Sequence, residues 1–203
     1  MSGPVVILID DQASVRHALG EMLNVFGFTV EIHDSADAFL QTLTGDRPGC
    51  IVADVRMPGT DGIELVRELA RRKISLPVIL ISGQADVPMA VAGLKAGAED
   101  FIEKPVDDTA LIAAINRAMA RASQSPPVTG ADGLTERFAR LTPRQIEIFD
   151  LVAQGYTSQA IAGRLEISAR TVESYRAQVM EKMQAESVAV LVRQAIRLGR
   201  ISP

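Results

Sequence analysis

The sequence has a single cysteine, two histidines and no long apolar run. One cysteine, Cys50, excludes a disulfide framework and a cysteine metal cluster, and its apolar surroundings indicate a small buried side chain. His17 and His33 have no companion at metal-binding spacing, so both are expected to be structural or exposed. No stretch reaches the roughly 18 apolar residues of a membrane span, and the N-terminus turns acidic too early for a signal peptide. We therefore expect a cytoplasmic protein with no membrane partner.

The 203 residues suffice for two domains, each with its own core. With 47% hydrophobic and 23% charged residues, the composition is that of an ordinary globular protein. The net charge of −4 is unevenly spread, because residues 1–138 hold 12 Lys and Arg against 19 Asp and Glu, whereas residues 139–203 hold 9 against 6. This asymmetry suggests an acidic domain joined to one that tolerates a polyanion.

Short apolar runs alternate with helical patterns up to Arg121. Near-continuous Val and Ile runs separated by helices predict an α/β fold, a small doubly wound domain whose parallel five-stranded sheet is covered on both faces. Ser35 and Asp86 are candidate N-caps, and Pro88 suits a first helical turn. These patterns leave the strand order open. The predicted strands are 5–9, 28–32, 50–53, 77–81 and 100–103, and the predicted helices are 13–26, 35–43, 61–72, 86–96 and 107–121.

The composition then changes to "ASQSPPVTGADG", which is typical of a linker. We predict a first domain over 1–123, a linker over 124–138 and a second domain over 139–203. Only helical patterns follow the linker, so the second domain is predicted to be all-α, with four helices and a central helix-turn-helix. Its start and stop signals are a capping box of Thr142 and Gln145, Pro143, Gly155, a cap at Thr157 or Ser158, Ser168, Ser187 and Gly199.

Polar residues follow the ends of four predicted strands. Because the carboxyl ends of the strands form the ligand crevice of a doubly wound sheet, these residues are expected to converge. Two unit charges about 4 Å apart repel by about 4 kcal/mol at an effective dielectric near 20, so three carboxylates there require a cation. The residues are Asp10 and Asp11 after the first strand, Asp54 after the third, Ser82 at the end of the fourth, and Lys104 and Pro105 after the fifth.

Oxygen ligands with open positions suit Mg²⁺, which favours a phosphate ligand. One of the carboxylates could then attack phosphorus and form an aspartyl phosphate, with Lys104 and the Ser82 hydroxyl placed to hold the phosphoryl oxygens. Any one of these aspartates alone is more simply a helix cap or a loop residue. Five matching residue types at four strand ends favour the site.

The motifs "LIDDQ", "VADVRMPGTDG", "LISGQADV" and "DFIEKP" resemble the receiver domain of two-component response regulators over nearly all of residues 4–121. The stretch "SGQADVPMAVAGLKAGAEDFIEKP" is most similar to the FixJ type. The resemblance implies a flavodoxin-like strand order 2-1-3-4-5 and phosphorylation of Asp54 by a sensor histidine kinase. The sequence departs from the family pattern at Ser82, where Thr is frequent, and at Val106, where Phe is common. Ser82 retains the required hydroxyl, so neither departure argues against phosphorylation.

The resemblance also implies individual roles. Mg²⁺, or Mn²⁺, would be held by Asp11, Asp54 and the backbone carbonyl of Arg56, with Asp10 acting mainly through water. The other implied roles are a switch pair of Ser82 and Phe101, a phosphoryl contact from Lys104 with a cis bond to Pro105, and a face for homodimerisation on phosphorylation that includes Val91 and Lys95.

Residues 141–195, from "LTPRQ" to "LVRQA", resemble the LuxR-type DNA-binding domain. Val172, Tyr175, Val179 and Met183 form an apolar stripe expected to pack in the core. Gln145 replaces the usual Glu, and "TSQAIA" replaces the common "SNKEIA". Carried over by position, Glu173, Ser174 and Ala177 would face base edges, Arg170, Thr171, Arg176 and Lys182 would lie toward phosphates, and Val188, Leu191 and Val192 would belong to a dimerisation helix.

These features favour a transcriptional regulator that is phosphorylated at Asp54, dimerises, binds double-stranded promoter DNA and acts on RNA polymerase. We expect no enzymatic activity beyond self-phosphorylation from a phosphodonor and slow self-dephosphorylation. Two alternatives stay open. One is a DNA-binding regulator whose receiver-like domain works without phosphorylation. The other is a Mg²⁺-dependent phosphatase of the haloacid dehalogenase type, which is disfavoured because such enzymes carry a DxD pair on the first strand, whereas here Arg56 follows Asp54 at that spacing on the third.

Overall fold

The computed structural model describes residues 5–45, 47–83, 87–122 and 133–201. Its contacts divide the chain into two compact units, one containing the sheet and the other containing the C-terminal helices together with residues 87–95. Among the described residues, no helix is long and apolar enough to cross a membrane.

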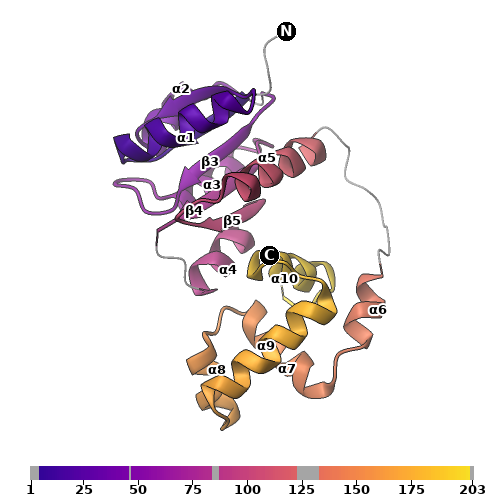
Figure 1. Ribbon diagram of the computed structural model, residues 1–203. Coiled ribbons are helices and arrows are strands. Elements are labelled where there is room, and N and C mark those ends of the chain that lie inside the picture. The colour runs from indigo at the N-terminus through magenta and orange to yellow at the C-terminus, as the bar shows by residue number, and fades with distance from the viewer. Residues whose placement is uncertain (1–4, 46, 84–86, 123–132, 202–203) are drawn as a thin grey trace. The chain divides into compact units, whose positions relative to one another are not determined.

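A parallel sheet of five strands forms the centre of the first unit, in the order β2-β1-β3-β4-β5 (Figure 1). This is the order that the resemblance implied and that the apolar patterns alone left open, and the flavodoxin-like fold is confirmed. Every strand lies within one residue of its predicted range. The strands are β1 (Val5–Ile9), β2 (Thr29–His33), β3 (Cys50–Asp54), β4 (Val78–Ser82) and β5 (Asp100–Glu103).

Five helices follow the strands in turn, each within one residue of its predicted ends. The Ser35 hydroxyl caps α2 by accepting from the Ala38 N–H at 3.3 Å, and Asp61 caps α3 by accepting from the Glu64 N–H at 2.7 Å. The predicted cap Asp86 lies outside the described residues. The helices are α1 (Ala13–Val25), α2 (Ala36–Thr42), α3 (Gly62–Arg71), α4 (Val87–Ala96) and α5 (Asp108–Ala122).

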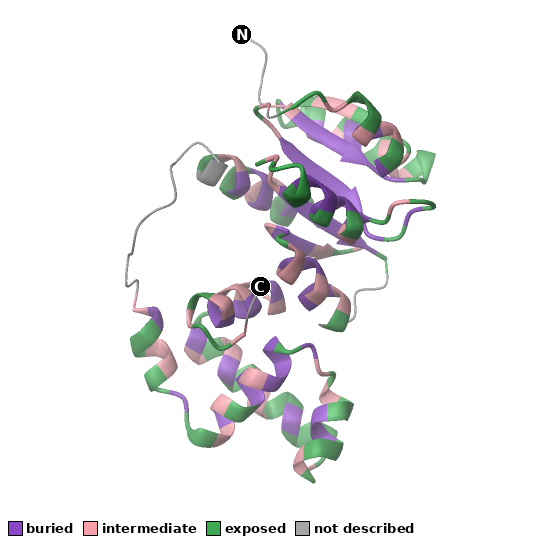
Figure 2. Ribbon diagram, turned by 180° about the vertical axis from the view of Figure 1, so that it is seen from behind, coloured by how far each residue is buried: buried purple, intermediate pink, exposed green. Residues whose placement is uncertain are grey.

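The central strands are buried on both faces, which explains their continuous apolar runs (Figure 2). Val6, Val52 and Ile79 pack with α1 and α5 on one face, so the alternate residues of these strands point to the face that carries α2 and α3. Cys50 lies in the core between the sheet and helices α1 and α5, and burial raises the pKa of its thiol to about 12. It is the small buried side chain that the sequence predicted.

The two histidines also lie as expected. The His33 ring packs edge-on against Phe39, with ring centroids 5.3 Å apart, and contacts the Glu31 carboxylate. His17 is exposed beside Glu21 on α1. Both are therefore surface or structural residues.

The second unit contains five helices within residues 133–201. The predicted capping box is present at the start of α7, and the hydroxyls of Thr157, Ser168 and Ser187 cap the three helices that follow. Its core includes Ile148, Phe149 and Val172. The helices are α6 (Leu134–Ala139), α7 (Pro143–Ala153), α8 (Ser158–Leu165), α9 (Ala169–Met183) and α10 (Val188–Arg197).

Helix α6 differs from the sequence prediction, which assigned its residues up to 138 to a linker over 124–138. Leu134 is buried in the helical core, and the Phe138 ring packs edge-on against Phe149 at 5.3 Å. The Arg200 guanidinium lies 5.4 Å from the centre of the Phe138 ring. A six-residue helix has little stability of its own, so α6 depends on these tertiary contacts. The local sequence pattern therefore does not predict it. The domain boundaries otherwise stay predictions.

Gly62 lets α3 begin directly against the end of β3, because a Cβ at this position would overlap the carbonyl oxygen of Asp54. We expect Gly62→Ala to lower the free energy of unfolding of the sheet-containing unit by about 1–3 kcal/mol, the usual cost of overpacking. Hydrogen exchange of the β3 amides in the full chain measures this. The matched control is Gly163→Ala in α8, where a Cβ meets nothing within 4 Å. It should instead stabilise its helix by about 1 kcal/mol, and equal effects of the two substitutions would contradict the packing argument.

Candidate functional site: a carboxylate pair bridged by lysine

The Lys104 ammonium lies between two buried carboxylates at the carboxyl edge of the sheet. Its Nζ donates to Asp10 Oδ2 at 2.8 Å and to Asp54 Oδ1 at 2.6 Å. The side chains of Asp10 and Asp54 are 0% and 7% exposed, so Lys104 compensates charges that water scarcely reaches. The ends of β1, β3 and β5 thus meet in one ionic cluster, as the sequence predicted.

The backbone of β4 and β5 places Lys104. Its N–H donates to the Ser82 carbonyl at 2.8 Å, which extends the pairing of the two strands by one residue, and its bond to Pro105 is cis, as the resemblance implied. Burial lowers the pKa of Lys104, but the hydrogen bonds that its ammonium donates to Asp10 and Asp54, with the negative charges of these two groups, outweigh burial. The pKa of Lys104 is therefore raised above its ordinary value. Lys104 is therefore cationic at neutral pH.

The second oxygen of each carboxylate is held by the backbone. The Gln12 N–H donates to Asp10 Oδ1 at 2.8 Å, and the Arg56 N–H donates to Asp54 Oδ2 at 2.6 Å. Both oxygens of Asp54 thus accept a hydrogen bond, so the carboxylate has a fixed orientation before any ligand arrives.

Asp11 is exposed, and the described residues contain no group of three or more His, Cys, Asp or Glu placed to hold a metal ion. In the structure, the cation shared by Asp10 and Asp54 is Lys104. The oxygen donors nevertheless have the chemistry that Mg²⁺ prefers. Ligation by Asp10, Asp11, Asp54 and the Arg56 carbonyl stays a prediction.

Ser82 and Phe101 are buried near this cluster. Asp54 pairs with Ile81 in the sheet register, so Ser82 is the next residue along β4, and Phe101 pairs with Leu80 on β5. Ser82 is 1% exposed, which places its hydroxyl inside the sheet edge. Their role as a switch pair stays a prediction. So does the receiver dimer face, of which Val91 is buried and Lys95 half-buried in this structure.

Helix α9, which carries the predicted base-facing residues, has one packed side and one open side. Val172, Val179 and Met183 are buried and Tyr175 packs partly against the same core, so the predicted apolar stripe is confirmed. The exposed side carries the three predicted base-facing residues and two of the predicted phosphate contacts, namely Glu173, Ser174, Ala177, Arg170 and Thr171.

Arg176, a predicted phosphate contact, bonds within the unit. Its side chain is only 19% exposed, and its guanidinium donates to the Ser158 hydroxyl at 2.5 Å and lies 3.6 Å from Glu173. The sequence offered Thr157 and Ser158 as alternative caps for α8. Thr157 provides the cap, so the Ser158 hydroxyl is available to Arg176, a role that no local pattern indicates.

Lys182 was also predicted to contact phosphate. It does not lie on the open side of α9 but belongs to a hydrogen-bond network around the buried Gln145. The Gln145 carbonyl oxygen accepts from the Thr142 N–H at 3.0 Å and from Lys182 Nζ at 2.8 Å, and its amide group donates to Gln178 at 2.8 Å. Lys182 also donates to the Arg140 carbonyl. The unusual Gln145 therefore keeps the capping box and joins α7 to α9.

The residues expected to belong to a dimerisation helix are largely buried in this structure. Leu191 and Val192 on α10 are 1% and 0% exposed, and Val188 packs partly against the same helices. Their role in dimerisation stays a prediction. An apolar stripe on a helix has the same pattern whether it covers its own core or a partner.

Comparison with known families agrees with this geometry. Residues 6–116 match the family described as "Response regulator receiver domain", and residues 139–195 match "Bacterial regulatory proteins, luxR family". The chain belongs to the response regulators of the FixJ type. It combines a receiver domain with a LuxR-type DNA-binding domain, which makes it a transcriptional regulator, and membership in this family sets aside the phosphatase alternative.

Curated relatives and solved structures cover both parts of this response regulator. The transcriptional regulatory protein FixJ of Rhizobium meliloti is 44% identical over 200 residues, with 98% of each chain covered, and that of Bradyrhizobium diazoefficiens is 41% identical over 198 residues, with 97% of each covered. The crystal structure of full-length FixJ from B. japonicum is 39% identical and matches with a TM-score of 0.56 over 100% of both chains.

The lysine bridge yields a stability prediction. We expect Lys104→Met to lower the free energy of unfolding of the sheet-containing unit by about 3 kcal/mol, because Asp10 and Asp54 would keep buried charges without their partner. Hydrogen exchange of the β3 amides in the full chain measures the change. The matched control is Lys73→Met, at an exposed lysine of the same unit, and it should stay within about 0.5 kcal/mol of the unsubstituted protein. Equal stability of the two variants would show that Lys104 does not compensate the pair.

A second prediction distinguishes the roles of Arg176 and Arg170 on α9. Arg176→Ala should lower the free energy of unfolding of the helical unit by about 1 kcal/mol, because it removes the hydrogen bond to Ser158. Arg170→Ala should leave stability unchanged but weaken binding to all DNA sequences alike and reduce the salt slope by about one. Urea unfolding and salt-dependent DNA titration measure the two effects. The reverse assignment would show that Arg176 is the phosphate contact.

Proposed function

We propose that Asp54 is the residue phosphorylated by a sensor histidine kinase. The observation that supports this assignment is the bridge to Lys104, because it holds the Asp54 carboxylate charged and oriented at the sheet edge. A carboxylate oxygen forms the new bond to phosphorus as the bond between phosphorus and the kinase imidazole breaks. The electron pair of that bond leaves with the imidazole nitrogen. Without a kinase, the same carboxylate takes a phosphoryl group from a small phosphodonor and loses it slowly to water.

The neighbouring oxygens suit Mg²⁺ or Mn²⁺ as the cofactor. Asp11, Asp54 and the Arg56 carbonyl would hold the ion, and Asp10 would act through water. When bound, the ion neutralises charge on the phosphoryl oxygens. The Lys104 ammonium, already at the site, provides a further contact to them.

Phosphorylation replaces a carboxylate by a group of charge about −1.5 to −2 with three acceptor oxygens. Lys104 and the buried Ser82 hydroxyl then turn toward these oxygens, and Phe101 follows into the space beside Ser82. This movement biases a two-state surface that includes Val91 and Lys95, through which two copies of the chain form a homodimer.

The homodimer binds double-stranded promoter DNA. Pairing brings two α9 helices to one pseudo-palindromic site and raises the effective concentration of the second helix, so affinity increases without new base contacts. The exposed side of α9 supports an assignment in which Glu173, Ser174 and Ala177 face base edges and Arg170 and Thr171 contact phosphates. Arg176 and Lys182 hold α9 to its neighbours. The bound dimer then acts on RNA polymerase.

Intact mass spectrometry tests the assignment of Asp54. After incubation with acetyl phosphate and Mg²⁺, we expect a gain of about 80 Da that is lost in Asp54→Asn. The exposed Asp34→Asn, as a matched control, should gain the same mass. Retention of the gain in Asp54→Asn would place the phosphoryl group elsewhere. The absence of a gain in the unsubstituted chain, with acetyl phosphate and with histidine kinases, would favour regulation without phosphorylation.

A further inference from the structure

The connection from β3 to α3, residues 55–61, carries the backbone group that orients Asp54. The Arg56 N–H donates to Asp54 Oδ2 at 2.6 Å, so the position of Asp54 depends on the conformation of this loop. The Gly62 N–H donates to the Val55 carbonyl at 3.0 Å and closes the base of the loop. Its tip, Pro58 and Gly59, is exposed and has no regular secondary structure.

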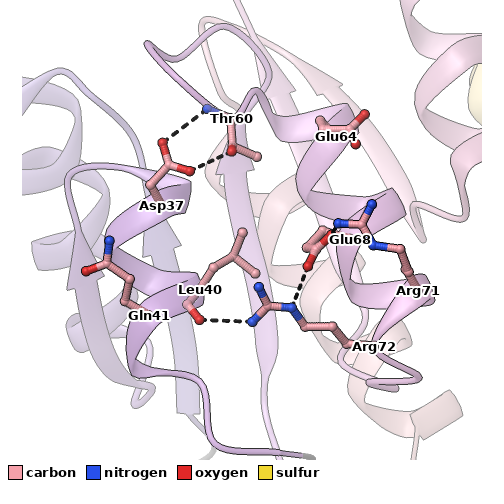
Figure 3. Close-up of a pocket in the computed structure, with 8 residues that line it drawn as sticks. All are labelled: Asp37, Leu40, Gln41, Thr60, Glu64, Glu68, Arg71 and Arg72. Atoms are coloured by element: carbon pink, nitrogen blue, oxygen red, sulfur yellow. Dashed lines mark hydrogen bonds and ion pairs between the residues drawn. The ribbon is translucent and has the colours of Figure 1, made fainter.

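Asp37, in the first turn of α2, holds this tip from outside the ionic cluster (Figure 3). Its Oδ1 accepts from the Thr60 hydroxyl at 2.6 Å, and its Oδ2 accepts from the Thr60 N–H at 3.3 Å. These hydrogen bonds lower the pKa of Asp37 below its ordinary value, so the carboxylate is ionised at neutral pH.

Gly59 makes this approach possible. It has φ of +77°, in the left-handed region, and a Cβ there would overlap Asp37 Oδ2. A side chain at position 59 would displace the end of the Asp37 side chain, so the glycine favours the observed contact between Asp37 and the loop.

Helix α2, which carries Asp37, is itself fixed to α3. The Arg72 guanidinium donates to the Leu40 carbonyl at 3.0 Å and to Glu68 at 2.5 Å, and Arg71 also pairs with Glu68. Figure 3 shows these links at one end of a cavity of about 400 Å³ and the link between Asp37 and Thr60 at the other. Asp37 thus acts from a helix that is anchored at both ends of the cavity.

We propose that Asp37 is a positioning residue for phosphorylation of Asp54, a proposal that rests on the function proposed above. By holding Thr60, Asp37 keeps loop 55–61 in the conformation in which Arg56 presents its N–H to Asp54 and its carbonyl to Mg²⁺. Loss of the contact leaves only a fraction of molecules in that conformation. The apparent affinity for Mg²⁺ falls to that fraction of its full value.

The test compares Asp37→Ala and Thr60→Ala, alone and combined, with Glu64→Ala in the full chain. Glu64 lines the same cavity and carries the same charge, but its carboxylate pairs with Arg67, so its variant controls for charge alone. The readouts are the Mg²⁺ dissociation constant by calorimetry, without phosphodonor, and the rate of mass gain with acetyl phosphate. Asp37→Asn, which keeps one acceptor oxygen, is the conservative variant.

We expect Asp37→Ala to weaken Mg²⁺ binding and to slow phosphorylation by about 3- to 10-fold each, because it removes both hydrogen bonds to Thr60 and each contributes little at an exposed position. Thr60→Ala should have a smaller effect because its N–H remains, the double variant should add little to Asp37→Ala, and Asp37→Asn should lie between. Unchanged values in Asp37→Ala, an equal change in Glu64→Ala, or additive effects would overturn the proposal even where Asp54 is phosphorylated normally. Failure of the unsubstituted chain to gain phosphate would instead overturn the proposed function, while the Mg²⁺ titration would still decide the role of Asp37.

Discussion

Burying two carboxylates at the end of a parallel sheet costs free energy unless a cation stays beside them, and in this protein that cation is the Lys104 ammonium. The requirement ties three separate strand ends together, because Asp10 follows β1, Asp54 ends β3 and Lys104 follows β5. It also places a cation 2.6 Å from the Asp54 carboxylate, which is only 7% exposed. The phosphoacceptor role proposed for Asp54 depends on both consequences.

Polar side chains that make hydrogen bonds to more than one element also occur away from the sheet edge. Asp54 is oriented by Lys104 and by the N–H of Arg56, and the loop that contains Arg56 is held by Asp37. In the helical unit, the buried Gln145 satisfies the start of α7 and binds Lys182 of α9. In both units, hydrogen bonds between separate elements fix the position of a polar side chain.

Much of this arrangement is predictable from the sequence, and the rest is not, for physical reasons. The β3 and β4 strands were predictable because burial on both faces leaves an uninterrupted apolar run, and the helix starts because Ser35, Thr142 and Ser168 carry their own capping groups. The site residues followed from the rule that strand ends converge. Helix α6 was not predictable because it depends on tertiary burial. The hydrogen bonds between Ser158 and Arg176 and between Asp37 and Thr60 join residues far apart in the sequence, so no local pattern indicates them. The α10 stripe was predictable as apolar, but an apolar stripe has the same pattern whether it is covered by its own chain or by a partner.

The central claim is that Lys104 is placed to hold a phosphoryl group on Asp54. A crystal structure of the full chain with Mg²⁺ and beryllofluoride, which mimics an acyl phosphate, tests it most directly. The account predicts beryllium bonded to Asp54, with Lys104 Nζ and the Ser82 hydroxyl each within about 3.2 Å of a fluorine. Beryllofluoride on another residue, or Lys104 still bonded to Asp10 alone with no contact to a fluorine, would contradict it.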